Sequence, residues 1–125
     1  KLHIDSKIHA NLDVMSLESM VINLIDNALK YGANSQVLAT LKVVPNNKFE
    51  FSVSDGGQGI PDSEKEKVFD RFYRRGNEDV RQTKGTGIGL YLVQLLVLQH
   101  QGNIGIEDNQ PSGTKFVISL PLIQL

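Results

Sequence analysis

The sequence predicts an α+β fold, a two-layer α/β sandwich in which helices cover one face of a mixed, mostly antiparallel sheet. Segments with alternating apolar residues are joined by short turns, which predicts hairpins. Two segments with apolar residues three and four apart predict helices. Strands follow one another in pairs, which disfavours a doubly wound parallel sheet. With 125 residues, we expect one domain over residues 1–125.

Composition excludes several classes of function. A net charge of −1 argues against a general nucleic-acid binder or a binder of anionic membranes. The absence of cysteine excludes disulfides and thiolate metal sites. His3, His9 and His100 lack a ligand-like spacing, so we expect structural or solvated roles for them. The longest apolar run, Ile88–Leu98, is too short to span a bilayer, and because the chain starts at Lys1 without Met we expect a piece of a longer protein.

The first helix is predicted from an N-cap at Asp13 to Tyr31, with Gly32 ending it. Its apolar residues recur on one face, which would pack on the core: Leu17, Met20, Val21, Leu24, Ile25 and Ala28.

A polar stripe runs along the edge of that buried face, formed by Asn23, Asn27 and Lys30 at i, i+4 and i+7. The asparagines could cap a loop, and the lysine could be solvated. Alternatively, the Asn27 amide oxygen could ligate a Mg²⁺ ion held by phosphates, because this metal prefers oxygen ligands and keeps several waters. Lys30 would then place a positive charge on a phosphate.

A hairpin is predicted from the strands Ser35–Val44 and Lys48–Asp55. In the second strand the alternating apolar residues are Phe49, Phe51 and Val53. This alternation puts Asp55 on the apolar side at the end of the strand. A carboxylate directed at the core needs partners, because burying it alone costs several kcal/mol.

The next helix is predicted to be short and to open with a capping box. Asp62 or Ser63 would cap it and Glu66 would close the box. Its apolar residues are Val68, Phe69 and Phe72. Residues 75–84 are polar, charged and without period, which predicts a mobile loop.

The final helix is expected over about Thr86–His100, and its apolar residues on nearly every side predict deep burial. Two strands follow, Asn103–Asp108 and Gly113–Leu120, joined by a turn at residues 109–112.

Thr114 opens the last strand on its core side, where an antiparallel neighbour would bring it close to Asp55. An ionised Asp55 only accepts hydrogen bonds, so it suits the exocyclic amine of adenine and repels the carbonyl oxygen of guanine. Gly57 and Gly59 would remove side chains where a planar base lies. The alternative is an ordinary Asp-Gly turn.

Three closely spaced glycines occur in Gly85-Thr86-Gly87-Ile88-Gly89-Leu90. The segment follows a polar loop and has GxGxG spacing, so it does not match the dinucleotide-binding fingerprint, and no P-loop motif is present. Such a backbone can approach a ligand, and the helix after it offers free N–H groups to an anion. The alternative is a flexible hinge before a buried helix.

Arginines near the short helix also permit two interpretations. Arg71, Arg74 and Arg75 flank phenylalanines and could form an exposed basic face. Beside a phosphate site, an arginine here could stabilise charge on a group being transferred. Taken together and in this order, the amide, carboxylate, glycine and arginine patterns predict a nucleotide site.

The same patterns resemble the ATP-binding catalytic domain of bacterial sensor histidine kinases, in the wider family of type II topoisomerase ATPases, MutL proteins and Hsp90 chaperones. The resemblance covers essentially the whole chain. Its motifs are the N box Asn23–Tyr31, the G1 box Asp55–Pro61, the F box Val68–Arg74, the G2 box Gly85–Leu90 and the ending Ser112–Leu122. It implies the Bergerat ATP-binding fold.

The resemblance also implies roles for residues. Asp55 would hold the adenine amine with help from Thr114 through a water, and Tyr31 and Ile60 would line the base. Asn27 would bind Mg²⁺. Catalytic roles would fall to Asn23, Lys30 and Arg74, with Lys30 and Arg74 on the phosphates and Arg74 nearest the γ-phosphoryl. Asn23 would also contact the nucleotide, as would Gly57, Gly59, Gly85, Thr86, Gly87, Gly89 and Leu90, and residues 75–87 would form the ATP lid.

One residue indicates the kind of ATP user. Hydrolytic relatives carry Glu at the position of Asn23, whereas an amide can orient water but cannot accept its proton. We therefore expect transfer of the γ-phosphoryl to a histidine and poor hydrolysis of ATP. Gly56 stands where the related kinases more usually have Asn, which we expect to loosen the first turn of the pocket.

The implied partners are a phosphoacceptor histidine helix of the same or the sister protomer and a downstream response regulator, without nucleic acid. Because no histidine of the chain lies in the usual sequence context of a phosphoacceptor helix, we expect the chain to bind ATP without phosphorylating itself. The parent protein would be a homodimer anchored in the inner membrane. This chain would be one of its cytoplasmic domains and would be a monomer on its own. The alternatives are a nucleotide-regulated interaction module without kinase activity and a serine protein kinase of the same superfamily.

Overall fold

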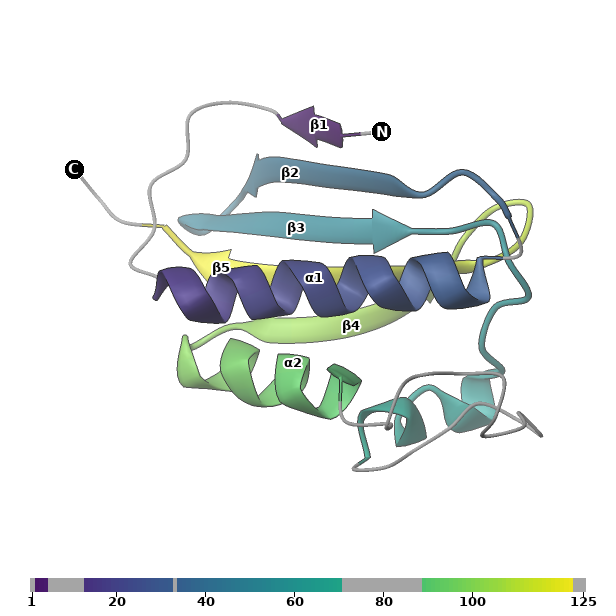
Figure 1. Ribbon diagram of the computed structural model, residues 1–125. Helices are drawn as coiled ribbons and strands as arrows, with labels where there is room; N and C mark the ends of the chain where they lie inside the picture. Colours follow the sequence, from purple (N-terminus) through teal and green to yellow (C-terminus); the bar gives the residue numbers. More distant parts are fainter. Residues whose placement is uncertain (1, 5–12, 33, 71–88, 123–125) are drawn as a thin grey trace.

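The computed structural model describes residues 2–4, 13–32, 34–70 and 89–122, and it is a two-layer α/β sandwich (Figure 1). The sheet consists of β1 (Leu2–Ile4), β2 (Leu38–Val44), β3 (Lys48–Ser54), β4 (Asn103–Asp108) and β5 (Thr114–Pro121). The helices are α1 (Val14–Tyr31) and α2 (Gly89–Gln99), with the short 3₁₀ helices η1 (Asp62–Glu64) and η2 (Lys67–Phe69). The predicted fold class is confirmed.

The strand order is β1-β2-β3-β5-β4, so β3 lies at the centre of the sheet. The pairs β2–β3, β3–β5 and β4–β5 are antiparallel, and β1 pairs with β2 in parallel. The sheet is therefore mixed and mostly antiparallel, as predicted. Strand β1 was not predicted, because three residues are too few to show an alternating pattern and their pairing partner, Ala39 opposite Leu2, lies far along the chain.

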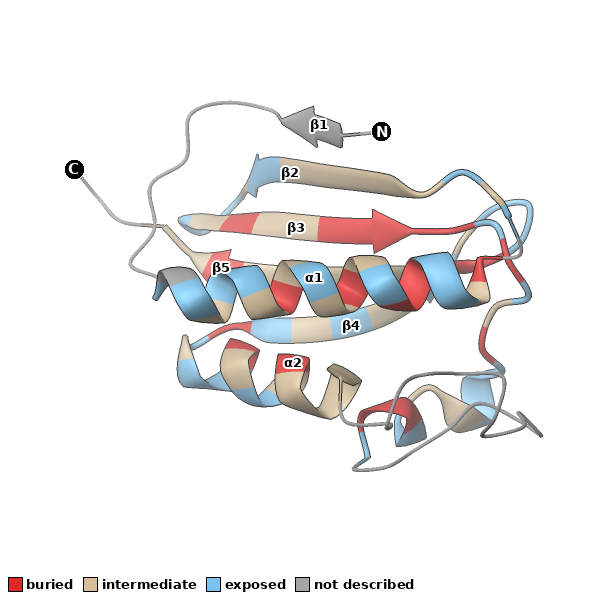
Figure 2. Ribbon diagram, in the orientation of Figure 1, coloured by how far each residue is buried: buried red, intermediate tan, exposed pale blue. Residues whose placement is uncertain are grey.

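Helix α1 begins and ends where the sequence predicts. The Asp13 carboxylate accepts the Ser16 amide (3.0 Å) and hydroxyl (2.9 Å), and Gly32 is the C-cap. Met20, Leu24 and Ala28 are buried against the sheet, as alternating colours along α1 show (Figure 2). Leu17, expected in the same stripe, is 37% exposed because it lies in the first turn, near the end of the sandwich.

The prediction that the last helix is deeply buried is wrong. In the described helix α2, only Val93 and Val97 are buried, while Leu95 and Leu98 are 39% and 58% exposed. The reason is geometrical: α2 contacts α1, β4 and η2 with one side, and its other side faces outward (Figure 1). Residues 86–88, where we expected the helix to start, lie outside the described residues.

The predicted capping box is also wrong. The segment forms two 3₁₀ turns, and the N-cap of η1 is Pro61, with no side-chain hydrogen bond. The Asp62 carboxylate instead binds Lys65. Val68 and Phe69 are buried as expected, and Phe69 meets Phe116 edge to face at 6.4 Å. Phe72 and residues 75–84 lie outside the described residues.

His100 has the structural role expected of it. Its Nδ1 lies 2.8 Å from the Leu96 carbonyl oxygen, and its Nε2 accepts the Asp13 amide at 3.4 Å. The ring therefore joins the end of α2 to the start of α1. The side chains of His3 and His9 lie outside the described residues. Among the helices that the structure describes, none is long and apolar enough to cross a membrane.

Candidate functional site

Most of the predicted site residues that the structure describes lie at one end of the sandwich, where α1 and β3 end and β5 begins (Figure 1). Asp55 directly follows β3, and Thr114 opens the neighbouring strand β5. The Asp55 amide donates to the Thr114 carbonyl at 2.9 Å. Both side chains are buried, with 2% and 1% exposure. The predicted proximity of Asp55 and Thr114 is confirmed.

The Asp55 turn, which we define as residues 55–57, lies against the end of α1. Oδ1 of Asp55 accepts the Gly57 amide at 2.9 Å. A Cβ on Gly57 would lie 2.0 Å from the Tyr31 carbonyl oxygen, and a Cβ on Gly32 would lie 3.4 Å from the Asp55 Cβ. Gly57 is thus required for backbone packing on α1, a reason that differs from the predicted clearance for a base.

Gly59 is required for a different reason, because its φ of +82° belongs to the left-handed region. It faces Gly113, whose carbonyl oxygen would lie 3.2 Å from a Cβ placed at position 59. The chain after the Asp55 turn is therefore fixed against the start of β5. Ile60 follows and is buried, with 5% exposure.

Two buried polar groups at this end lack a hydrogen-bond partner among the described residues: the Asn27 amide nitrogen and the Thr114 hydroxyl. Asn27 is 8% exposed and lies one helical turn before Tyr31. A buried polar group left unpaired costs about 1–3 kcal/mol. Both atoms are thus available to a ligand or to water.

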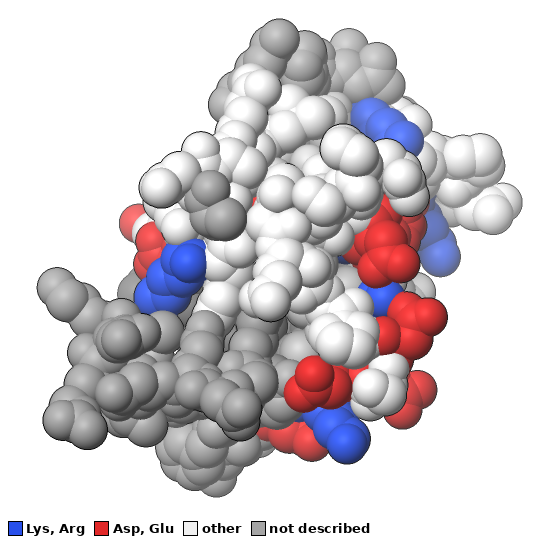
Figure 3. Space-filling view, turned by 90° about the vertical axis from the view of Figure 1, so that its right-hand side faces the viewer, with Lys and Arg blue, Asp and Glu red and all other residues white. Residues whose placement is uncertain are grey.

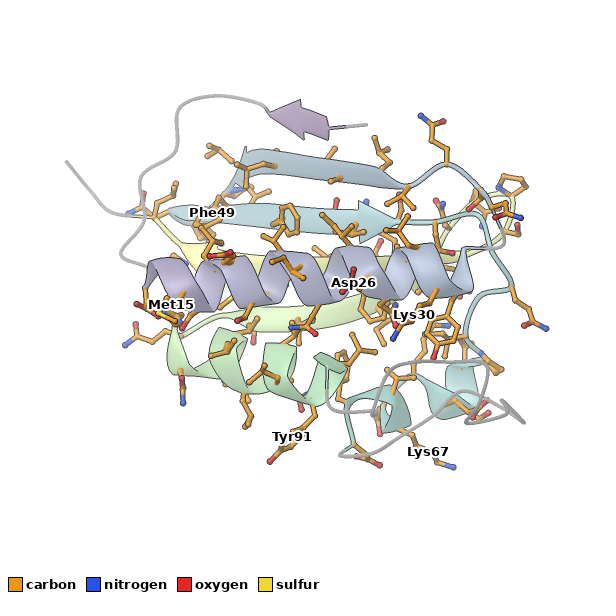
Figure 4. The ribbon with its side chains drawn as sticks, in the orientation of Figure 1. Met15, Asp26, Lys30, Phe49, Lys67 and Tyr91 are labelled. Atoms are coloured by element: carbon orange, nitrogen blue, oxygen red, sulfur yellow. The ribbon has the colours of Figure 1, made fainter. Side chains whose placement is uncertain are left out.

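Lys30 is exposed near the end of α1, and its side chain leaves the helix on the side of α2 and the 3₁₀ helices (Figure 4). Tyr31 is half-buried. Viewed onto this end, the described surface is uncharged through its middle and carries acidic and basic side chains to either side (Figure 3).

Asn23 is held by its own helix and lies against the start of α2. Its Nδ2 donates to the Ser19 carbonyl at 2.7 Å. Its Oδ1 would lie 2.8 Å from a Cβ on Gly89, so a larger residue at position 89 would have to displace the Asn23 side chain. Leu90 is half-buried. The other predicted site residues, Arg74, Gly85, Thr86 and Gly87, lie outside the described residues, as does the lid at 75–87.

Three polar side chains that the sequence analysis assigned no role hold the Asp55 turn. Ser35 Oγ accepts the Gly56 amide at 2.8 Å, Asn109 Nδ2 donates to the Asp55 carbonyl at 2.8 Å, and Ser112 Oγ donates to the Gly56 carbonyl at 3.1 Å. Both backbone groups of Gly56 are hydrogen-bonded, and the expectation that Gly56 loosens this turn stays a prediction. The sequence signal is weak, since Asn and Ser in loops are common.

A charged cluster lies beside the site. Lys65 contacts Asp62 of η1 and Asp108 at the end of β4, the latter at 2.8 Å. The hydrogen bonds to Asp108 and then to Asp62 raise the pKa of Lys65 above its ordinary 10.5. The hydrogen bond and charge of Lys65 lower the pKa of Asp62 below 3.8. The described residues contain no group of three His, Cys, Asp or Glu side chains that could hold a metal ion.

Comparison with known proteins agrees with this geometry. The chain is 40% identical over 114 residues to the histidine-protein kinase/phosphatase MprB of Mycolicibacterium paratuberculosis and 37% identical over 114 residues to the sensor protein RprX of Bacteroides fragilis. These alignments cover 87% and 90% of the chain but 22% of each relative, so the chain spans about a fifth of their length.

A solved structure of a mycobacterial sensor histidine kinase, MprB, superposes with a TM-score of 0.80 at 30% identity, over 99% of this chain and 84% of the other. The profile of one protein family, described as histidine kinase-, DNA gyrase B- and HSP90-like ATPases, matches residues 12–124. This match covers nearly the whole chain, including α1, the Asp55 turn and β5. The chain therefore belongs to the family of histidine kinase-, DNA gyrase B- and HSP90-like ATPases.

Proposed function

We propose that this domain binds ATP with Mg²⁺ and passes the γ-phosphoryl to a histidine on a separate helical domain of the same or the sister protomer. The observation that carries the proposal is the pair of unpartnered buried groups, Asn27 Nδ2 and Thr114 Oγ1, at the end that also holds the buried Asp55. Leaving both groups unpaired would cost about 2–6 kcal/mol, twice the penalty for one. Family membership supports a nucleotide as the ligand.

The base would be recognised at Asp55. Because Oδ1 already accepts the Gly57 amide, the carboxylate is fixed in direction before any ligand arrives. An acceptor fixed in this way favours the amine of adenine over the carbonyl of guanine. Thr114 would complete the polar side of this contact through a water, and Tyr31 and Ile60 would cover the faces of the ring.

The residues on α1 fit a magnesium–phosphate group. Mg²⁺ bound to phosphate oxygens and water takes few protein ligands, and it supplies charge neutralisation at the transferred phosphoryl. Asn27 would supply its amide oxygen as one ligand of the ion, and its unpartnered nitrogen would donate to a phosphate oxygen or to water. Lys30, exposed one turn later, would place its charge on a phosphate, as would Arg74 nearest the γ-phosphoryl.

Backbone amides near Gly85, Thr86, Gly87 and Gly89 would complete the phosphate contacts, with residues 75–87 as the lid. Asn23 would orient groups without taking a proton, because an amide has no useful basicity near neutral pH. Its Nδ2 is already engaged by Ser19 on the same helix. A site without a base to take a proton from water favours a nucleophile that attacks without losing a proton, such as the unprotonated nitrogen of imidazole, over hydrolysis.

The first test is calorimetric titration of the chain with ATP, ADP and GTP, each with and without Mg²⁺. We expect binding of ATP and ADP, much weaker binding of GTP, and tighter binding of ATP when Mg²⁺ is present. Equal binding of ATP and GTP would contradict the role of Asp55, and the absence of any nucleotide binding would support an interaction module instead.

The second test uses γ-labelled ATP. We expect the chain alone to remain unlabelled and to hydrolyse ATP slowly, and we expect a helical phosphoacceptor domain added to it to acquire acid-labile label on histidine. Acid-stable label on serine would indicate the serine-kinase alternative. Self-labelling of the chain, or fast steady-state hydrolysis, would contradict the proposal. A homodimeric parent, a response regulator downstream and attachment of the parent to the inner membrane are part of the same proposal.

A further inference from the structure

The Asp55 turn is held by three side chains from two loops that are remote in sequence. Ser35 lies between α1 and β2, while Asn109 and Ser112 lie in the loop between β4 and β5. Together with the Asp55 amide on the Thr114 carbonyl, they satisfy the backbone N–H and C=O groups of Asp55 and Gly56. Each of these four bonds is 2.8–3.1 Å long.

We propose that Ser35, Asn109 and Ser112 are positioning residues that set the direction of the Asp55 carboxylate and thereby the preference for adenine. This inference rests on the proposed function. A glycine at position 56 has no side chain with which to hold the turn, and the three partners replace that missing constraint from outside. The contact that recognises a base depends on direction, since a hydrogen bond weakens steeply as its angle departs from linear.

Each of the two loops is itself anchored. The Ser35 amide donates to the Gly32 carbonyl at 2.9 Å, which ties Ser35 to the end of α1. The Asn109 amide donates to the Gly113 carbonyl at 3.0 Å, which closes the loop between β4 and β5. Gly113 has a φ of +108°, and a Cβ there would lie 1.9 Å from the Asp55 carbonyl oxygen. The loop therefore presses directly on the carbonyl that Asn109 binds.

The sharpest variant is Asn109→Asp, which keeps the size of the side chain but replaces the donor by an acceptor facing the Asp55 carbonyl. Its matched control is Asn103→Asp, the same charge change at the exposed far end of β4. Ser112→Ala and Ser35→Ala are milder variants that each remove one hydroxyl. Affinities for ATP, ADP and GTP would be measured by calorimetry, and melting temperatures by circular dichroism.

We expect Asn109→Asp to lower the affinities for ATP and ADP by the same factor, about tenfold. We also expect it to reduce the ratio of ATP affinity to GTP affinity. We expect each serine variant to lose about three- to tenfold in affinity for ATP and to reduce the same ratio, and we expect Asn103→Asp to change neither. A purely structural role would lower the melting temperature without changing the ratio of ATP to GTP affinity, and that result in the serine variants would overturn the inference. If Asn109→Asp does not fold, the ratios of ATP to GTP affinity of the two serine variants are sufficient to test the inference.

The two proposals fail in different ways. If the unaltered chain bound no adenine nucleotide, the proposed function would fail. If the unaltered chain preferred ATP over GTP and the folded variants kept the same preference and affinity, only the positioning inference would fail.

Discussion

The Asp55 amide donates to the Thr114 carbonyl at 2.9 Å, so two neighbouring strands place a buried carboxylate beside a buried hydroxyl that lacks a partner among the described residues. This relationship predicts that changes at the two positions affect nucleotide binding for different reasons. Asp55 supplies the charge and the direction of an acceptor. Thr114 supplies a polar atom whose burial is unfavourable until something binds it.

Replacing Asp55 by Asn should abolish the preference for adenine. Asn can still accept the Gly57 amide through its oxygen, so the turn should keep its shape. Its amide nitrogen would then face the adenine amine, donor against donor, at a cost of about 1–3 kcal/mol or roughly 5- to 150-fold in affinity. Calorimetry with ATP and GTP measures the change, and Asp26→Asn on the exposed face of α1 is the matched control (Figure 4). Unchanged affinity for ATP would remove Asp55 from the site.

Replacing Thr114 by Val should move stability and binding in opposite directions. The variant removes a buried hydroxyl that has no partner among the described residues, so the nucleotide-free domain should be as stable or more stable by about 1 kcal/mol. Nucleotide affinity should fall, because the contact to the ligand is lost.

Thr40→Val is the control for that experiment, because Thr40 is hydrogen-bonded to the buried Ser52 across the sheet. Removing its hydroxyl should destabilise the domain by about 1–3 kcal/mol without altering nucleotide affinity. Chemical denaturation measures both variants. A destabilised Thr114→Val domain would show that this hydroxyl already has a partner in the free protein.

Replacing Gly57 by Ala should destabilise the domain itself. Its Cβ would lie 2.0 Å from the Tyr31 carbonyl oxygen, and backbone at both places would have to shift, at a cost of about 1–3 kcal/mol or more. Gly105→Ala is the control, because a Cβ at that strand position meets nothing within 4 Å. Urea unfolding of both variants tests this, and equal stabilities would show that α1 and the Asp55 turn pack less closely than described.

The Lys65 cluster should contribute a small, pH-dependent part of stability. The lowered pKa of Asp62 gives a contribution that is present above 3.8 and is lost as the pH falls through its value in the folded protein. The raised pKa of Lys65 gives a contribution that is present below 10.5 and is lost as the pH rises through its value in the folded protein.

Comparison of the unaltered chain with Lys65→Met tests this dependence. The difference in melting temperature should be constant between about pH 5 and 9 and should shrink at both extremes. Because the Asp62 side chain is 91% exposed, the difference should also decrease as salt is added. A difference that grew at low pH would contradict the assigned pairing.

Local features of the fold could be predicted from the sequence, and non-local ones could not. The N-cap at Asp13 and the stop at Gly32 depend on neighbouring residues, and both were predicted correctly. The strand β1 and the exposed side of α2 depend on what lies across the fold, and both were missed or wrong. Hydrophobicity alone could not show that α2 has a neighbour on only one side.

The same distinction applies to the site. Asp55 and Thr114 could be placed together because side chains alternate regularly between the two faces of a strand and because neighbouring strands were expected to be antiparallel. The role of Asn109 could not be predicted, because its partner is a backbone carbonyl 54 positions away. The requirement for glycine at position 57 could not be predicted from the sequence either, because its close approach to Tyr31 results from the packing of a helix end on a turn.

The residues with unpartnered atoms come from opposite ends of the chain, Asn27 from α1 and Thr114 from β5. A molecule that bridged them would act as a removable cross-link between the two layers of the sandwich. Ligand present at a hundred times its dissociation constant adds about 2.7 kcal/mol to the unfolding free energy. Rising and falling nucleotide levels would thus tighten or relax the whole domain, well beyond the residues in contact.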